Sequence, residues 1–279
     1  MLRAGPYVSN RRQTMNPNEL TVQSLRRIIL DQSFRARVGH IGSALCVADL
    51  VHVLYHRILR VPSPEDPDRD RFVLAKGHAA LALYGVFYQK GWLTKEQLNS
   101  YCADNSLLGV HPEHGLPGVD FGTGSLGQGL SMGAGAALAA RLQKSDRRVY
   151  VLMSDGECNE GACWEAAMFA AHQGLSNLTA IVDVNGQQAL GFTRDVMNLQ
   201  PLADRWRAFG WSVVEIDGHD VAQIVAAMKP GSDRAPRVVL ARTTFGKGVS
   251  YMKDQIKWHY WPMSDDEYKQ AVREIGGQS

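Results

Sequence analysis

The stretch VYVLMSDGECNEGACWEAAMFAAHQGLSNLTAIVDVNGQQALG, residues Val149–Gly191, decides the fold of this 279-residue chain. It begins with an apolar run, Val149–Met153, that is typical of a buried strand in a parallel sheet. Apolar residues at helical spacing follow over Ala162–Gln173, and a second apolar run occupies Leu178–Val182. The pattern predicts a strand, a helix and a second parallel strand, the unit from which α/β sheets are built.

Each of these two predicted strands is followed by a polar residue suited to binding a metal. Asp155 follows the first strand and Asn185 follows the second. Because ligands bind beyond the carboxyl ends of parallel strands, we expect both side chains at one edge of the sheet. Carboxylate and amide oxygens suit Mg²⁺ or Ca²⁺, and magnesium often keeps phosphate oxygens as further ligands. The arrangement suggests a metal that holds a diphosphate; an ordinary strand-end aspartate and an Asn-Gly turn are the alternative.

Three further apolar runs complete the predicted sheet: Arg71–Ala75, Trp211–Ile216 and Arg237–Ala241. Helical patterns separate the runs, and no internal repeat interrupts them. About five strands alternating with helices predict one doubly wound α/β domain over residues 18–279, a parallel sheet with helices on both faces.

The composition excludes several classes of protein. The chain is 45% apolar and 21% charged with a net charge of +2, so no strong field for nucleic acid or a membrane surface is expected. No apolar run reaches the roughly 18 residues that a membrane span needs. The four cysteines form no C-x-x-C pair, which suits a reducing compartment, and we expect a cytoplasmic protein.

Residues 1–17 are predicted to be a disordered extension. The segment MLRAGPYVSNRRQTM is basic and lacks the apolar core of a secretion signal. A transit peptide is one alternative, and translation from Met15 is another.

A glycine-rich stretch, Gly122–Gly129, contains a literal G-x-G-x-x-G. A dinucleotide site would need a buried strand before it and, about 20 residues later, a strand that ends in an acid. The preceding HGLPGVDF is no buried strand and no such acid follows, so we do not expect a dinucleotide site. The stretch opens a Gly- and Ala-rich helix, Leu130–Leu142, whose small residues suit either close packing within the chain or a subunit interface.

Ser154-Asp155-Gly156, followed after 28 residues by Asn185, resembles the thiamine diphosphate motif of Gly-Asp-Gly, a gap and Asn. Glu160-Gly161 and Trp164–Ala167 resemble the transketolase version of this motif, and the similarity runs from about Leu20 to Tyr268. It corresponds only to the amino-terminal half of a transketolase, so the chain resembles the amino-terminal subunit of a split enzyme. Ser154 replaces the first motif glycine and leaves the metal ligand intact.

This resemblance implies the diphosphate-binding half of the thiamine diphosphate-binding fold, with thiamine diphosphate and Mg²⁺ (or Ca²⁺) as cofactors. It places the metal on the side chains of Asp155 and Asn185 and on the main-chain oxygen of Gln187. The residues implied to bind the cofactor are His78, Gly124, Ser125, Leu126, Asp155, Gly156, Glu157 and Asn185.

Three histidines match family motifs in the first half of the chain. His40 lies in a loop similar to S-G-H-P-G, with Ile41 in place of the proline. His78 ends RFVLAKGH, which is similar to the family's R-F-V-L-S-x-G-H. His111 lies in a segment similar to G-H-P-E, with Val110 inserted.

A fourth histidine, His259, follows Trp258 as in the family's W-H-G-K-A-P, but Tyr260 and Trp261 come next. From this departure we expect the two aromatics either to close the site around another acceptor or to pack against a partner. The resemblance implies four catalytic histidines: His40, His111 and His259, which would orient the sugar and stabilise the developing alkoxide, and His78, which would lie beside the diphosphate.

The activity implied is transfer of a two-carbon ketol unit from a ketose donor to an aldose acceptor, as sugars or sugar phosphates. In this family the other half of the enzyme supplies the cofactor-activating glutamate and the phosphate-binding arginines. We therefore expect activity only with a separate carboxy-terminal, pyrimidine-binding subunit, in an α₂β₂ assembly without nucleic acid or membrane. The α-type subunit of a 2-oxo acid dehydrogenase or decarboxylase is one alternative, and a non-catalytic scaffold is another.

Overall fold

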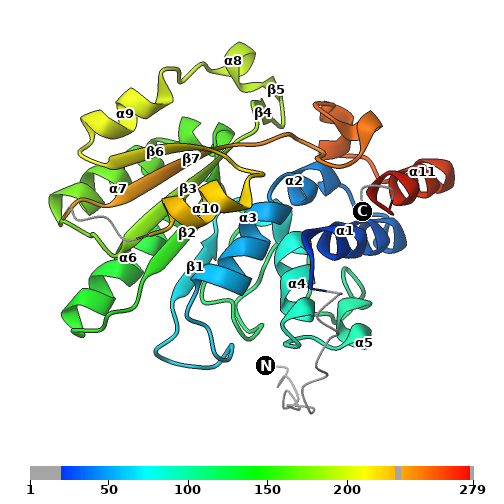
Figure 1. The fold of residues 1–279 in the computed structure, drawn as a ribbon, viewed down its shortest axis with the longest axis horizontal. Coiled ribbons are helices and arrows are strands. Elements are labelled where there is room, and N and C mark those ends of the chain that lie inside the picture. The colour runs from blue at the N-terminus through cyan, green and yellow to red at the C-terminus, as the bar shows by residue number, and fades with distance from the viewer. Residues whose placement is uncertain (1–19, 230–233, 277–279) are drawn as a thin grey trace.

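The structure is a computed structural model that describes residues 20–229 and 234–276, and the expected extension at residues 1–17 lies outside these ranges. The main sheet has five parallel strands (Figure 1). In spatial order they are β1 (Arg71–Leu74), β2 (Val149–Ser154), β3 (Leu178–Val184), β7 (Arg237–Arg242) and β6 (Ser212–Asp217). All five predicted strands are confirmed.

The order of the strands explains why helices cover both faces of the sheet. The chain moves in one direction from β1 through β2 and β3 to the edge strand β6, and then returns to β7. Because parallel crossovers are right-handed, this reversal moves the connecting helix to the opposite face. Accordingly α6 (Gly129–Leu142), α7 (Gly161–His172) and α9 (Leu202–Ala208) pack in one core, and α10 (Val221–Ala227) packs in the other.

Successive residues of each strand belong to different cores. Val149, Val151 and Met153 pack with α6 and α7, whereas Tyr150 and Leu152 pack with the helices on the other face. This alternation follows from the two-residue period of a strand. Since both faces are buried, the strand sequence is a continuous apolar run rather than an alternating one.

The amino-terminal helices build the second core, together with α10. The helical segment after His40 is divided at Val47, and its last turn is π-helical over Leu54–Ile58. The α-helices not yet given are α1 (Val22–Ala36), α2 (Ile41–Cys46), α3 (Ala48–Val53), α4 (Ala80–Gln89), α5 (Lys95–Leu98) and α11 (Asp265–Gly276), with the single turn α8 (Thr193–Val196) described below.

The segment after β3 contains short elements that the sequence did not predict. A hairpin of two-residue strands, β4 (Gln187–Gln188) and β5 (Gly191–Phe192), precedes the single turn α8 (Thr193–Val196). Strands of two residues are too short to show a two-residue period, so the sequence pattern does not indicate them. Asp220 caps α10, because its side chain accepts hydrogen bonds from the first turn of this helix.

Two negative expectations can be compared with the structure. Within the described ranges, no helix combines the length and the apolarity needed to cross a membrane. All four cysteines are free thiols, three of them buried.

The small residues of α6 bring this helix close to the sheet. A Cβ atom at Gly133 would lie 2.3 Å from Cγ2 of Val151, and one at Gly129 would lie 2.3 Å from Cβ of Ala75. At Gly135, on the outer side of the helix, a Cβ atom would meet nothing within 4 Å. Close packing within the chain is therefore confirmed, and a subunit interface on the outer side of α6 stays a prediction.

Gly133→Ala should destabilise the isolated chain by about 1–3 kcal/mol, because the added methyl group overpacks the contact with Val151. Gly135→Ala is the matched control in the same helix, and should be neutral or stabilise by up to about 1 kcal/mol through helix propensity. Urea denaturation of both variants measures the difference. Equal effects at the two positions would contradict the packing described for α6.

Candidate active site

A buried ion pair lies at the carboxyl edge of the sheet. Lys76 follows β1, Asp183 lies near the end of β3, and their side chains are 1% and 0% exposed. Burial alone would raise the pKa of Asp183, but the charge and hydrogen bond of Lys76 outweigh burial and lower it. Burial would likewise lower the pKa of Lys76, and the charge of Asp183 more than compensates, so that pKa is raised. Both groups are therefore ionised at neutral pH.

Three further side chains converge on Asp183 and complete its hydrogen bonds. Cys46 Sγ of α2 lies 3.1 Å from Oδ1, and the hydroxyl of Thr243, after β7, donates to the same oxygen. Asn185 Nδ2 donates to Asp183 Oδ2 at 2.8 Å. This last bond fixes the Asn185 amide, whose Oδ1 accepts from the main-chain nitrogen of Gln187 at 2.8 Å.

The predicted metal ligands come together at this edge. Asp155, which is 7% exposed, accepts at Oδ1 from Gly156 N and at Oδ2 from Gly186 N, both at 2.9 Å. The second bond joins Asp155 to the residue after Asn185. The main-chain oxygen of Gln187 lies 3.8 Å from the Cβ position of Gly156, beside Asp155. The structure therefore gathers three oxygen donors from two strand ends.

The electrostatics of Asp155 favour a bound cation. Burial, followed by the negative charge of Asp183, raises the pKa of this carboxyl to about 7. A buried carboxylate is costly unless it is paired with a positive charge. A divalent cation at Asp155 would therefore stabilise the ionised form.

Two segments near these ligands, residues 40–43 and β4, contain buried polar atoms that have no hydrogen-bond partner among the described residues. Buried polar atoms in proteins are normally paired, so unpaired ones indicate a missing partner. Among the described residues they include His40 Nδ1, Ser43 Oγ, Gln187 Oε1 and Nε2, and Gln188 Nε2.

The donor set also fits the expected metal. One carboxylate, one amide oxygen and one main-chain oxygen form a hard set that suits Mg²⁺. Residues 20–229 and 234–276 contain no group of three His, Cys, Asp or Glu side chains placed to hold a metal ion. The residues present thus fit a magnesium ion with a polar ligand such as a diphosphate.

Three of the four predicted histidines form a triangle. The ring centroids of His40 and His78 are 5.4 Å apart, those of His78 and His259 are 5.6 Å apart, and those of His40 and His259 are 5.9 Å apart. The main-chain nitrogen of His40 donates to the His259 carbonyl at 3.2 Å. The His259 ring stacks on Phe245, with centroids 5.1 Å apart. Three segments distant in sequence thus deliver imidazoles to one place.

These three imidazoles are neutral at pH 7. Burial lowers the pKa of His40 and lowers that of His78 well below its ordinary value. Burial, followed by the charge of Lys76, lowers the pKa of His259 to about 4. A neutral imidazole has one N–H donor and one acceptor nitrogen, so each ring can both give and take a hydrogen bond.

His111 belongs to the same group. The positive charge of a protonated His111 would lower the pKa of both His40 and His78. His111 Cγ lies 3.3 Å from the Cβ position of Gly124, and its carbonyl accepts from the hydroxyl of Tyr84 at 3.1 Å. The inserted Val110 therefore does not remove His111 from the cluster.

Glu157 anchors the glycine-rich stretch to the end of β2. It is fully buried, and its Oε1 accepts from Gly127 N at 2.9 Å while its Oε2 accepts from Ser154 N at 3.4 Å. Burial raises the pKa of this carboxyl to about 7. Since both oxygens accept from main-chain nitrogens, Glu157 ties the glycine-rich stretch that contains Gly124–Leu126 to the end of β2, next to Asp155.

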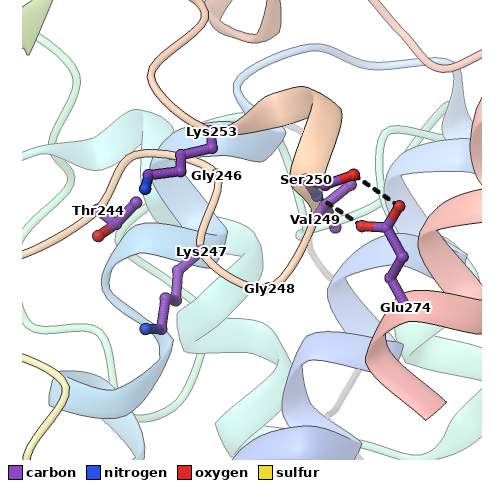
Figure 2. Close-up of a pocket in the computed structure, with 8 residues that line it drawn as sticks. All are labelled: Thr244, Gly246, Lys247, Gly248, Val249, Ser250, Lys253 and Glu274. Atoms are coloured by element: carbon purple, nitrogen blue, oxygen red, sulfur yellow. Dashed lines mark hydrogen bonds between the residues drawn. The ribbon is translucent and has the colours of Figure 1, made fainter. Parts of the chain in front are cut away.

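The segment that carries His259 is held to α11 at Ser250. Glu274 of α11 accepts from Ser250 N at 2.5 Å and from Ser250 Oγ at 2.7 Å. Figure 2 shows these bonds on one side of a hollow and Lys247 and Lys253 on the other. The hollow measures about 460 Å³ and is lined by Thr244, Gly246, Lys247, Gly248, Val249, Ser250, Lys253 and Glu274. Lys253 is exposed and Lys247 is half-buried, and this hollow has no part in the chemistry described below.

The structure adds residues that the sequence did not single out. Lys76 and Asp183 both sit at strand ends, so the rule that located Asp155 would have located them too. The hydroxyl of Ser43, which has no partner among the described residues, had no such signal. His219 pairs with Asp49 at 2.7 Å and accepts from Thr244 N at 2.9 Å, so its contacts are structural.

Known proteins resemble this chain over most of its length. The family described as "Transketolase, thiamine diphosphate binding domain" matches residues 18–279. An apulose-4-phosphate transketolase subunit from Phocaeicola vulgatus is 40% identical over 261 residues, covering 92% of this chain and 93% of that one. The 6-deoxy-6-sulfo-D-fructose transketolase subunit SqwG of a Clostridium species is 37% identical, with 90% and 93% covered.

Solved structures give the same result for the fold. The crystal structure of transketolase from Campylobacter jejuni matches with a TM-score of 0.86 at 31% identity. The match covers 94% of this chain and 43% of that one. The chain thus spans less than half the length of that transketolase, but nearly the whole length of the two subunits named above.

Asp155→Asn should change how the stability of the metal-free chain depends on pH. Because the pKa of Asp155 is raised to about 7 by folding, this group favours the folded state below about pH 4, and that contribution is lost as pH rises through 7. An asparagine at position 155 does not titrate, so Asp155→Asn removes this loss. The unfolding free energy of the variant minus that of the unaltered chain should therefore rise by about 1–4 kcal/mol from pH 5 to pH 8. Urea denaturation at several pH values measures this. The control Asp104→Asn, at an exposed site, should show no trend, and the same flat result for Asp155→Asn would contradict the assigned environment.

Proposed function

This chain belongs to the transketolase family, and on that premise we propose that it is the amino-terminal subunit of a two-component transketolase. The observation that carries the proposal is the convergence of a carboxylate, an amide oxygen and a main-chain oxygen beside three neutral histidines. Thiamine diphosphate, when bound, supplies the electron sink for breaking and making the carbon–carbon bond of a ketose.

Residues at the carboxyl edge of the sheet would hold this cofactor and its metal. We assign the divalent metal, Mg²⁺ or Ca²⁺, to Asp155, Asn185 and the main-chain oxygen of Gln187. We also assign His78 to donate a hydrogen bond to the diphosphate. We assign Gly124–Leu126 and Gly156 to the lining of the cofactor site. Gly156 also lets the hairpin approach the end of β2, since a Cβ at Gly156 would lie 2.8 Å from Cβ of Gln188.

The histidines would act on the sugar. A neutral imidazole can donate its N–H to a sugar oxygen that gains negative charge, and its other nitrogen can accept a proton from a hydroxyl. His40 is suited to this because its Nδ1 is buried and unpaired within the described residues. We assign sugar orientation and proton transfer to His40, His111 and His259, with His78 shared between the sugar and the cofactor.

The partner is proposed from the names of the relatives. Both similar proteins are named as transketolase subunits, and this chain aligns with nearly their whole length. We infer that a separate carboxy-terminal subunit supplies the pyrimidine-binding half, in an α₂β₂ assembly in the cytoplasm. The names of both relatives contain a sugar with a phosphate or sulfo group, so we propose an anionic ketose as the donor.

Ketol transfer by the purified chain with and without its partner subunit tests the proposal. We expect transfer from ketose to aldose only with both subunits, thiamine diphosphate and Mg²⁺ present. Transfer by this chain alone would contradict the split assembly. Turnover of 2-oxo acids instead of sugars would indicate a dehydrogenase or decarboxylase subunit, and cofactor binding in neither form would indicate a non-catalytic scaffold.

His40→Ala should lower kcat of the two-subunit enzyme by about 10²–10⁴-fold, the usual contribution of a positioned acid or base. Affinity for thiamine diphosphate should stay within a few-fold, because His40 is assigned to the sugar. Steady-state kinetics and cofactor titration of the same preparation separate these effects. His172→Ala, at the carboxyl end of α7 and outside the histidine cluster, is the control. Undiminished turnover in His40→Ala would contradict the assigned role.

A further inference from the structure

Tyr260 connects the segment that carries His259 to the hairpin that carries Gln187. Its hydroxyl donates to the main-chain oxygen of Ala189 at 2.6 Å, across 71 positions of sequence. The side chain is half exposed, at 53%, so burial of the ring does not by itself explain its position. Figure 1 shows the segment after β7 and the β4–β5 hairpin at the same edge of the molecule, above α2.

The main chain of Tyr260 contacts the loop that carries His40. A Cβ atom at Gly39 would lie 2.4 Å from the Tyr260 carbonyl oxygen, so the two loops are in contact through their backbones. Tyr260 N donates to the Lys257 carbonyl at 3.1 Å, and His40 N donates to the carbonyl of His259. The backbone of Tyr260, whose hydroxyl bonds to Ala189, is therefore held in place by these contacts.

The hairpin that contains Ala189 has little support of its own. Each of its strands has two residues, and isolated hairpins are marginal in water even when they are longer. At its turn Leu190 is 80% exposed, and both Gln187 and Gln188 have buried side-chain atoms without a partner among the described residues. A hydrogen bond to Ala189 from a rigid neighbour therefore restricts the hairpin more than it would restrict a long strand.

The position of the hairpin sets the position of one proposed metal ligand. The main-chain oxygen of Gln187 lies beside Asp155, and Gln187 is two residues from the Ala189 carbonyl that accepts from Tyr260. Movement of the hairpin would move the Gln187 oxygen relative to the side chains of Asp155 and Asn185, which the sheet holds. The metal would then lose one of its three protein oxygens.

We propose that Tyr260 is a positioning residue: its hydroxyl holds the hairpin so that the Gln187 oxygen faces the metal site. This inference rests on the proposed function, since it concerns the metal of that cofactor site. It gives Tyr260 a role within the chain, in addition to any contact of its exposed ring with an acceptor or a partner.

The test compares Tyr260→Phe with Tyr251→Phe in the two-subunit enzyme. Tyr251 is a matched control because its hydroxyl also donates to a main-chain carbonyl at 2.6 Å, that of Glu267, away from the hairpin. Mn²⁺, titrated with thiamine diphosphate present and followed by electron paramagnetic resonance, is the probe. We expect Tyr260→Phe to weaken Mn²⁺ binding about three- to tenfold, the range for loss of one hydrogen bond, and Tyr251→Phe to leave it unchanged.

Amide hydrogen exchange of the cofactor-free chain separates this proposal from the proposed function. Tyr260→Phe should speed exchange at Gln187–Thr193, whether or not the cofactor binds, and Tyr251→Phe should not. Faster exchange with unchanged Mn²⁺ affinity would overturn the positioning role, as would unchanged exchange. If the unaltered pair bound no Mn²⁺ with thiamine diphosphate, the proposed function would fail, and the exchange data would still report whether Tyr260 holds the hairpin.

Discussion

The buried ion pair of Lys76 and Asp183 is the interaction on which the carboxyl edge of the sheet depends. Two charges removed from water are stable only when they neutralise each other and their remaining hydrogen-bonding capacity is filled. Asp183 meets that condition through Lys76 after β1, Cys46 on α2 and Thr243 after β7. One carboxylate thus joins three segments to β3. Asn185 takes its orientation from the same carboxylate, so the predicted metal ligand depends on the pair.

The same edge is electrostatically prepared for a cation and for polar ligands. Asp155 lies in surroundings that penalise its charge, whereas the nearby histidines are held neutral by burial. A divalent metal would relieve the first cost. The neutral rings keep both donor and acceptor atoms available for a sugar at physiological pH. Burial, which usually excludes water from a core, here sets the protonation states that the proposed chemistry needs.

Much of this arrangement was predictable from the sequence, and the reason differs from residue to residue. The five strands were evident because burial on both faces makes each one a continuous apolar run. The placement of Asp155 and Asn185 at one edge followed from their positions after two of those strands. The meeting of His40, His78 and His259 did not follow from any local pattern, since tertiary packing brings their segments together. It was expected only from the resemblance to a family, as was the hairpin's main-chain oxygen. The resemblance implied that Glu157 binds the cofactor, whereas its described hydrogen bonds come from the main chain of Gly127 and Ser154. The hydrogen bond from Tyr260 to Ala189 was not expected at all.

The central claim is that this chain builds the metal and diphosphate half of a thiamine diphosphate site, which a second subunit completes. Calorimetric titration of thiamine diphosphate with Mg²⁺ into the chain alone, into the chain with its partner subunit, and into the pair carrying Asp155→Ala tests that claim most directly. The account predicts tight binding by the unaltered pair only, with heat release lost in Asp155→Ala. Equal binding by the chain alone, or by the pair carrying Asp155→Ala, would contradict it.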